Sequence, residues 1–151
     1  MGVQGVITVK IIAAGTIKSS ERYFSDACAE YVKRLGRFCR VETVELPEDA
    51  PPREFIRRMG AKAARIALCV EGKTASSAGF AGMIGAAARE GGSEIDFVIG
   101  GPDGLDEEVK SACGTRLSFS PMTFPHRLMR VILLEQLYRA FTILNGMKYD
   151  R

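Results

Sequence analysis

Apolar residues along this chain switch repeatedly between the spacing typical of a strand and the spacing typical of a helix. Short β-branched or alternating runs predict strands at 6–12, 41–46, 66–70, 95–99 and 117–120. Apolar residues three and four apart predict helices at about 19–40, 53–64, 106–113 and 125–145. The same spacing predicts a further helix that contains Phe80 and Ala87. This alternation predicts a single α/β domain over residues 1–151, built on a parallel sheet covered on both faces.

The last predicted helix is apolar around nearly its whole circumference. Leucine, isoleucine, valine and aromatic residues between 128 and 144 point in almost every direction from its axis. Such a helix must be covered on more than one side. We therefore expect an isologous homodimer that packs across it.

Two predicted strands each run directly into a polar loop. Strand 95–99 leads into Gly100-Gly101-Pro102-Asp103-Gly104, and strand 117–120 leads into a loop that Pro121 and Pro125 bracket. The glycine segment has neither the G-x-G-x-x-G spacing of a dinucleotide site nor the Lys-Ser/Thr of a P-loop. Since parallel sheets bind ligands at the carboxyl ends of their strands, the two loops predict one pocket for a small ligand.

Composition narrows the function classes only slightly. The net charge of +3 over 151 residues permits a nucleic-acid partner without requiring one. Four cysteines without a C-x-x-C pair predict a reduced, cytoplasmic protein, and a single histidine leaves too few soft ligands for a zinc site. We expect no bound metal, no export and no membrane segment.

Basic residues gather where the last helix begins. His126 is the only side chain that ordinarily titrates near neutral pH, and it fits either a structural hydrogen bond or a catalytic role. Arg127, Arg130 and Arg139 lie on the same, otherwise apolar helix. They form either a solvated stripe or contacts to an anion or RNA.

Several long motifs, in order, resemble one known family. These are FVIGGPDGL at 97–105, LSFS at 117–120, MTFPH at 122–126 and EQLYRAF at 135–141, with AAGTIK at 13–18, EYVKRL at 30–35 and LCVEGK at 68–73 upstream. Together they resemble the ribosomal RNA large subunit methyltransferase H family of the SPOUT superfamily. The likeness covers nearly everything after about residue 7.

The resemblance implies a fold and a reaction that the hydrophobic pattern does not contain. It implies a C-terminal trefoil knot over about 66–151, an S-adenosylmethionine pocket and a homodimer. The implied reaction methylates N3 of a pseudouridine in a 23S rRNA stem-loop on the assembled ribosome. Pattern alone predicts an open, unthreaded sheet.

The resemblance also assigns residues. Cofactor contacts carry over to Leu68, Gly100, Phe119, Ser120, Pro121, Met122, Thr123 and Phe124. The methyl-transfer chemistry makes His126 a candidate base, with Arg139 or Arg151 stabilising the developing negative charge and Tyr149 reaching the target base. Asp150 stands where the family has a histidine, so any role of that histidine is missing here or passes to another group.

Two other functions stay open at this level. One is a SPOUT enzyme that methylates tRNA or another rRNA site, although the lack of an appended RNA-binding domain argues against a free-RNA substrate. The other is a noncatalytic dimer that binds ribosomes and keeps a vestigial pocket. Failure to bind S-adenosylmethionine would favour the second.

Overall fold

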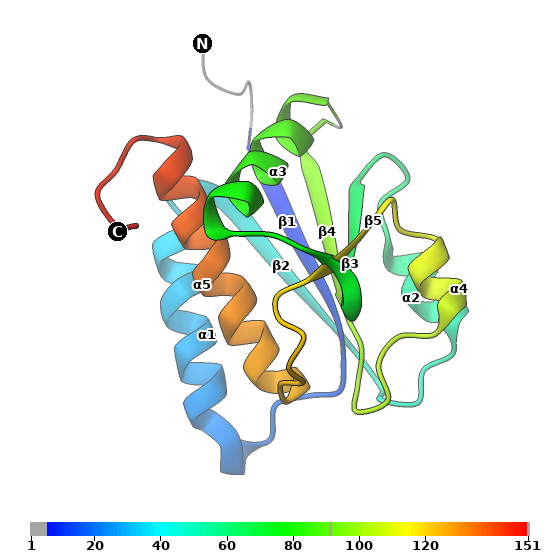
Figure 1. Cartoon of the computed structure of the whole chain (residues 1–151). Helices are drawn as coiled ribbons and strands as arrows, with labels where there is room; N and C mark the ends of the chain where they lie inside the picture. The colour runs from blue at the N-terminus through cyan, green and yellow to red at the C-terminus, as the bar shows by residue number, and fades with distance from the viewer. Residues whose placement is uncertain (1–5, 91, 151) are drawn as a thin grey trace.

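The computed structural model, which describes residues 6–90 and 92–150, contains a five-stranded sheet between two layers of helices (Figure 1). The strand order is β2-β1-β4-β3-β5, and every pair of named strands is parallel. The strands are β1 (Ile7–Ala14), β2 (Cys39–Leu46), β3 (Ala64–Thr74), β4 (Glu94–Ile99) and β5 (Thr115–Ser118). The predicted parallel α/β sheet is confirmed.

Helices cover both faces of this sheet. The helical elements are the 3-10 turn η1 (Ser19–Glu21), α1 (Arg22–Leu35), α2 (Pro52–Arg58), α3 (Ser77–Glu90), α4 (Glu107–Ser111) and α5 (His126–Leu144). Figure 1 shows α1, α3 and α5 on one face and α2 with α4 on the other. Along β1, Ile11 packs into the first layer and Ile12 into the second, so both faces of the strand are buried.

Two predicted helices end earlier than their apolar pattern indicates. The first ends at Leu35 rather than near Arg40, because β2 begins at Cys39 and pairs there with Ile7. The helix at 53–64 ends at Arg58, and the Gly60 N–H donates instead to Asp96 Oδ2 at 2.8 Å. Contacts that are distant in sequence override helical spacing in both places.

The start of α1 also differs from the prediction. Ser19 and Ser20 lie in η1, and no side-chain hydrogen bond caps α1. By contrast, Ser76 Oγ accepts the Gly79 N–H at 3.0 Å and so caps the first turn of α3.

Strand β3 runs past its predicted end at residue 70 and continues to Thr74. Its register with β5 shifts on the way, since Leu117 pairs with both Leu68 and Lys73. The two backbones approach closely, and a Cβ at Gly72 would lie 2.8 Å from backbone atoms of Arg116 and Leu117. The bulge at 69–72 brings the end of β3 toward the loops that follow β4 and β5.

Helix α5 is enclosed largely by its own chain. It packs between α1 and α3 over the sheet, and Leu133, Leu137 and Ala140 are fully buried (Figure 1). The prediction that this helix is covered on more than one side is confirmed. Its apolar circumference alone therefore does not require a second copy of the chain.

Candidate functional site

Two loops meet at the carboxyl ends of neighbouring strands. The glycine loop (100–105) follows β4, and the 119–125 loop follows β5. Together with residues 68–71 of β3, they line a cavity of about 640 Å³. The predicted shared pocket is confirmed, and its volume is typical of sites for small ligands and cofactors.

The glycine loop folds back on itself so tightly that side chains are excluded at one position. Gly101 O accepts the Gly104 N–H at 2.9 Å, and Gly104 has a φ of +78°. A Cβ on Gly100 would lie 2.5 Å from the Gly104 carbonyl carbon. Glycine is therefore needed at Gly100 for close approach and at Gly104 for the left-handed conformation.

The 119–125 loop is held by two short-range hydrogen bonds. Ser118 Oγ donates to Ser120 O at 2.9 Å, and Met122 N donates to Ser120 Oγ at 3.0 Å. The Phe119 ring packs edge-on against Phe80, with ring centroids 5.7 Å apart. This loop presents backbone groups and apolar side chains to the cavity.

Most of the predicted cofactor residues line this cavity. They are Leu68, Gly100, Phe119, Ser120, Met122, Thr123 and Phe124. Pro121 is the exception, because it stands in the exposed turn of the loop and does not line the cavity. Met122 is 72% exposed and lies at the cavity's edge.

Sequence reasoning missed two charged residues of the lining, Glu71 and Lys110, whereas Asp103 lies in the predicted glycine loop. Glu71 comes from the end of β3 and Lys110 from α4. Parallel-strand topology could have placed Glu71 near the pocket, because β3 ends at the same edge of the sheet. No sequence signal places Lys110 there.

His126 lies at the first turn of α5 and lines the cavity. Its side chain is 12% exposed, and Nε2 stands 3.6 Å from Glu48 Oε1 with no hydrogen-bond partner among the described residues. Burial, together with the neighbouring Arg127 charge, lowers the pKa of His126 below its ordinary 6.5. The imidazole is therefore neutral at pH 7 and able to accept a proton.

The next two arginines of α5 are occupied within the protein. Arg127 Nε donates to Thr16 O at 2.7 Å and pairs with Glu48. Arg130 is only 4% exposed, donates to Gly15 O and pairs with Glu45. The interpretation of Arg130 as an RNA or anion contact is therefore wrong, and both residues fasten α5 to the segment after β1.

Arg139 and Tyr149 form a separate cluster. Glu135 Oε2 accepts from Arg139 Nη2 at 2.7 Å and from the Tyr149 hydroxyl at 2.9 Å, and Asp150 Oδ1 accepts from Arg139 Nη1 at 2.9 Å. Burial and the Glu135 carboxylate raise the pKa of Tyr149 to about 12. Asp150 is thus a direct ionic partner of Arg139.

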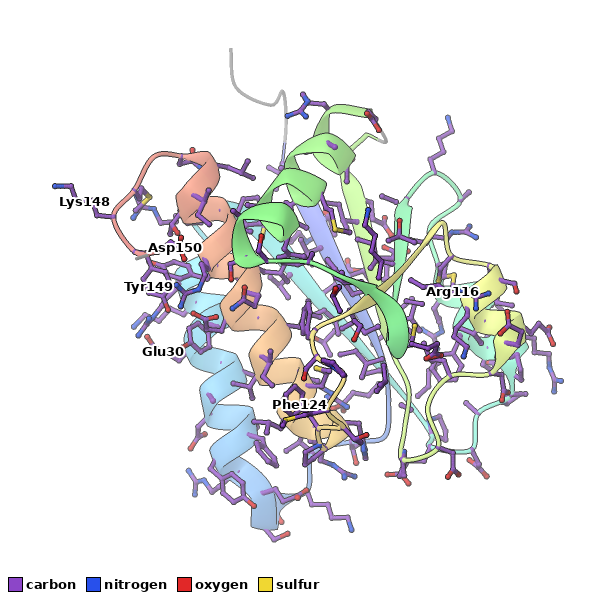
Figure 2. The ribbon with its side chains drawn as sticks, in the orientation of Figure 1. Glu30, Arg116, Phe124, Lys148, Tyr149 and Asp150 are labelled. Carbon is purple, nitrogen blue, oxygen red and sulfur yellow. The ribbon has the colours of Figure 1, made fainter. Side chains whose placement is uncertain are left out.

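This cluster is remote from His126 within one chain. Between His126 and Arg139 the helix rises by about 20 Å, and neither Arg139 nor Tyr149 lines the cavity. Figure 2 shows Phe124 near the start of α5. Tyr149 and Asp150 lie beside α1, toward the opposite end of α5. Arg151 lies outside the described residues.

The described residues hold no group of three or more His, Cys, Asp or Glu side chains placed to bind a metal ion. Within residues 6–90 and 92–150, no helix is both long and apolar enough to cross a bilayer. All four cysteines are free.

Comparison with known proteins defines the class. Residues 7–150 match the family described as "Predicted SPOUT methyltransferase". A ribosomal RNA small subunit methyltransferase E from Neisseria gonorrhoeae, solved bound to S-adenosyl methionine, shares the fold with a TM-score of 0.56 at 11% identity. The match covers 91% of this chain and 66% of that one. The fold is therefore that of a SPOUT methyltransferase, a class that uses S-adenosylmethionine.

Curated relatives narrow the class to one family. The Ribosomal RNA large subunit methyltransferase H of Limosilactobacillus reuteri is 41% identical over 96% of this chain and 100% of that protein. The protein of the same name from Bacillus cytotoxicus is 40% identical over the same shares. The chain belongs to the ribosomal RNA large subunit methyltransferase H family.

Proposed function

We propose that this protein transfers a methyl group from S-adenosylmethionine to N3 of a pseudouridine in a 23S rRNA stem-loop on the assembled ribosome. The observation that carries this proposal is one cavity built from the glycine loop and the 119–125 loop, with a neutral His126 at its edge. The names of the 40–41% identical relatives support large-subunit rRNA as the substrate. Such a substrate places the enzyme in the cytoplasm, with the ribosomes.

The residues of the cavity fit the cofactor. Leu68, Met122 and Phe124 offer apolar walls for a flat adenine ring, and the 119–125 loop offers backbone donors and acceptors for its edge. Gly100 lets the chain fold closely around a ligand. S-adenosylmethionine supplies an electrophilic methyl on a sulfonium, which leaves S-adenosylhomocysteine after transfer.

His126 is our candidate for the general base. It lies at the cavity's edge in its neutral form and can take the proton that N3 of pseudouridine loses. Arg139 or Arg151 would stabilise the negative charge that develops on the base, and Tyr149 would help to position it. Holding the base in line with the methyl accounts for most of the acceleration.

Arg139 stands about 20 Å along α5 from His126, and Tyr149 shares Glu135 with it, outside the cavity. Both residues therefore require a second copy of the chain to act at this site. A homodimer would bring the tail of one protomer to the cavity of its partner. Its interface would include the outer side of α1, where Tyr23 is 61% exposed and packs on Phe24 with ring centroids 4.6 Å apart. Tyrosine can contribute both apolar contact area and a hydrogen bond to such an interface.

Sedimentation at micromolar concentration tests the dimer. We expect a dimer, and Tyr23→Glu should shift it toward monomer by adding charge at the interface. Lys18→Glu changes an exposed charge in the turn before α1 and should leave the dimer intact. A stable wild-type monomer would contradict the two-chain site.

We also propose that the segment after residue 66 is knotted. Ala75 and Ser76, which connect β3 to α3, line a second cavity of about 250 Å³ together with Ser77, Phe119, Phe124 and Gln136. Ser77 Oγ donates to Gln136 Oε1 at 2.7 Å. The β3–α3 connection and the β5–α5 connection therefore lie against each other, and they cross in the view of Figure 1. Such a crossing is what a threaded C-terminal segment requires.

Methyl transfer from radiolabelled S-adenosylmethionine tests the function. The substrates are assembled ribosomes, free large subunits and tRNA, all from cells that lack this activity. We expect label at a single pseudouridine N3 of 23S rRNA in ribosomes. Label on tRNA or at another rRNA position would favour a different SPOUT substrate, and failure to bind the cofactor would favour a noncatalytic ribosome-binding protein.

A further inference from the structure

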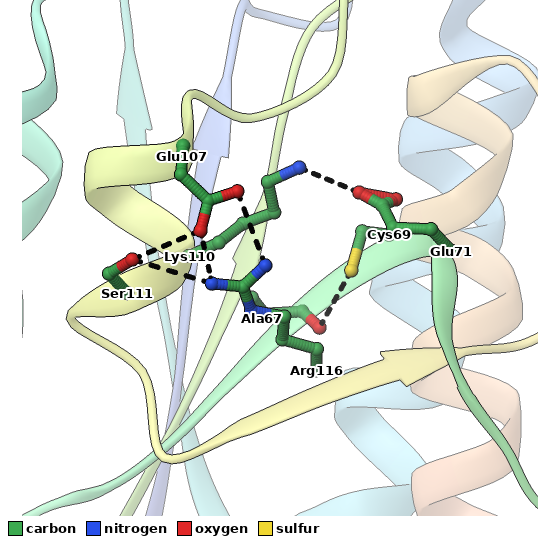
Figure 3. A network of polar contacts seen from close by, with 7 residues as sticks. All are labelled: Ala67, Cys69, Glu71, Glu107, Lys110, Ser111 and Arg116. Carbon is green, nitrogen blue, oxygen red and sulfur yellow. Dashed lines mark hydrogen bonds and ion pairs between the residues drawn. The ribbon is translucent and has the colours of Figure 1, made fainter.

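An ion pair lies at the edge of the large cavity. Lys110 Nζ, from α4, donates to Glu71 Oε1, at the end of β3, across 2.6 Å. Figure 3 shows the two side chains reaching toward each other from these elements, with Cys69 nearby. Glu71, Lys110 and Cys69 all line the cavity, yet none of them belongs to the glycine loop or the 119–125 loop.

The pair has a distinctive charge pattern within the lining. Among the described residues that line the cavity, Lys110 carries the permanent positive charge, and Glu71 and Asp103 carry the negative charges. His126 is neutral at pH 7 because its pKa is lowered. A ligand carboxylate in this cavity therefore finds its ionic partner at Lys110.

Both charged groups keep free hydrogen-bonding capacity. The ammonium of Lys110 has three donors, and the carboxylate of Glu71 has about four lone-pair sites. Their pairing uses one Glu71 oxygen, Oε1. Lys110 is 15% exposed and Glu71 is 55% exposed, so the lysine is held in place and the carboxylate is accessible.

The fold does not depend on this pair to hold α4. On the same helix, one turn before Lys110, Glu107 pairs with Arg116 of β5, and Ser111 Oγ also donates to Glu107 (Figure 3). Val109 of α4 is buried in the core between the sheet and the layer formed by α2 and α4. The Glu71–Lys110 pair is therefore available for a ligand, while these other contacts fasten α4.

We propose that Glu71 and Lys110 bind the amino-acid end of S-adenosylmethionine, with Lys110 on its carboxylate and Glu71 on its ammonium. The two ligand charges sit on one carbon atom and have opposite signs, as do the two side chains that face them. Charge-assisted hydrogen bonds of this kind are among the strongest in proteins. This inference rests on the proposed cofactor and adds to it the residues that distinguish the amino-acid end from the nucleoside.

Two ligands distinguish recognition of the amino-acid end from a general effect on the cavity. S-adenosylhomocysteine carries the amino-acid end, and 5′-methylthioadenosine keeps the nucleoside and the sulfur but lacks it. Their dissociation constants are measured by calorimetry on the wild-type protein, Lys110→Met and Glu71→Gln. Arg57→Met and Glu54→Gln are the matched controls, since they make comparable chemical changes in an ion pair of α2 that lies outside the cavity.

We expect Lys110→Met to weaken S-adenosylhomocysteine binding about tenfold to a hundredfold, with 5′-methylthioadenosine binding unchanged within about twofold. Glu71→Gln should weaken S-adenosylhomocysteine by about threefold to tenfold, because solvent screens its exposed carboxylate. Both controls should bind both ligands as the wild type does. Equal weakening of the two ligands, or no weakening, overturns the proposal, whereas a wild-type protein that binds neither ligand overturns the proposed function itself.

Discussion

Replacing His126 by glutamine should lower methyl transfer to ribosomes by about 10²- to 10⁴-fold, the usual contribution of a general base. Glutamine is close to histidine in size and polarity but cannot take up a proton near neutral pH. The substitution should lower the rate constant for methyl transfer. S-adenosylhomocysteine binding, measured by calorimetry, should stay within about threefold, because His126 stands at the cavity's edge and not in either loop.

The pH dependence gives this role a signature that a structural histidine would lack. Burial and the charges of Arg127 and Arg130 lower the pKa of His126, while Glu48 and Glu21 oppose them. The imidazole is therefore the free base at pH 7, and the wild-type rate should fall as the pH drops through a value below 6.5. In His126→Gln this acid limb should vanish. The same limb in the variant would assign the base to another group.

The fold could be predicted largely because apolar spacing reports burial. Strand 6–12 is largely apolar on both faces, and the structure buries both faces of β1. The ends of elements were less predictable. Phe38 continues the apolar spacing of α1, yet it follows the helix and stacks on Phe141 of α5, a contact distant in sequence.

The candidate site, too, could be predicted from the sequence only in part. The two loops could be predicted because glycine and proline punctuate the ends of parallel strands, and topology brings such ends together. Arg130 could not be assigned from sequence, because its partners Glu45 and Gly15 O are distant in the chain. Lys110 was missed for the same reason. Spacing reports which residues share a face, but not which charged side chains find partners across the fold.

The second large effect is expected at the glycine loop. Gly100→Ala should lower the free energy of unfolding by about 2–4 kcal/mol and weaken S-adenosylhomocysteine binding at least about tenfold. An added Cβ would stand 2.5 Å from the Gly104 carbonyl carbon and 2.8 Å from Leu105 N. These are backbone atoms of the same loop, so no side chain can rotate away. The loop must open, and its opening displaces the groups that face the cofactor.

Gly101→Ala is the matched control one residue along. There an added Cβ would lie 3.6 Å from Ala14 Cβ, an ordinary contact, and Gly101 has no positive φ. We expect unfolding and ligand binding to change by less than about 1 kcal/mol. Denaturant unfolding and calorimetry on both variants decide the matter. Equal losses in the two variants would mean that the loop responds to any added methyl group, whereas a loss confined to Gly100→Ala ties the cofactor cavity to the closed conformation of this loop.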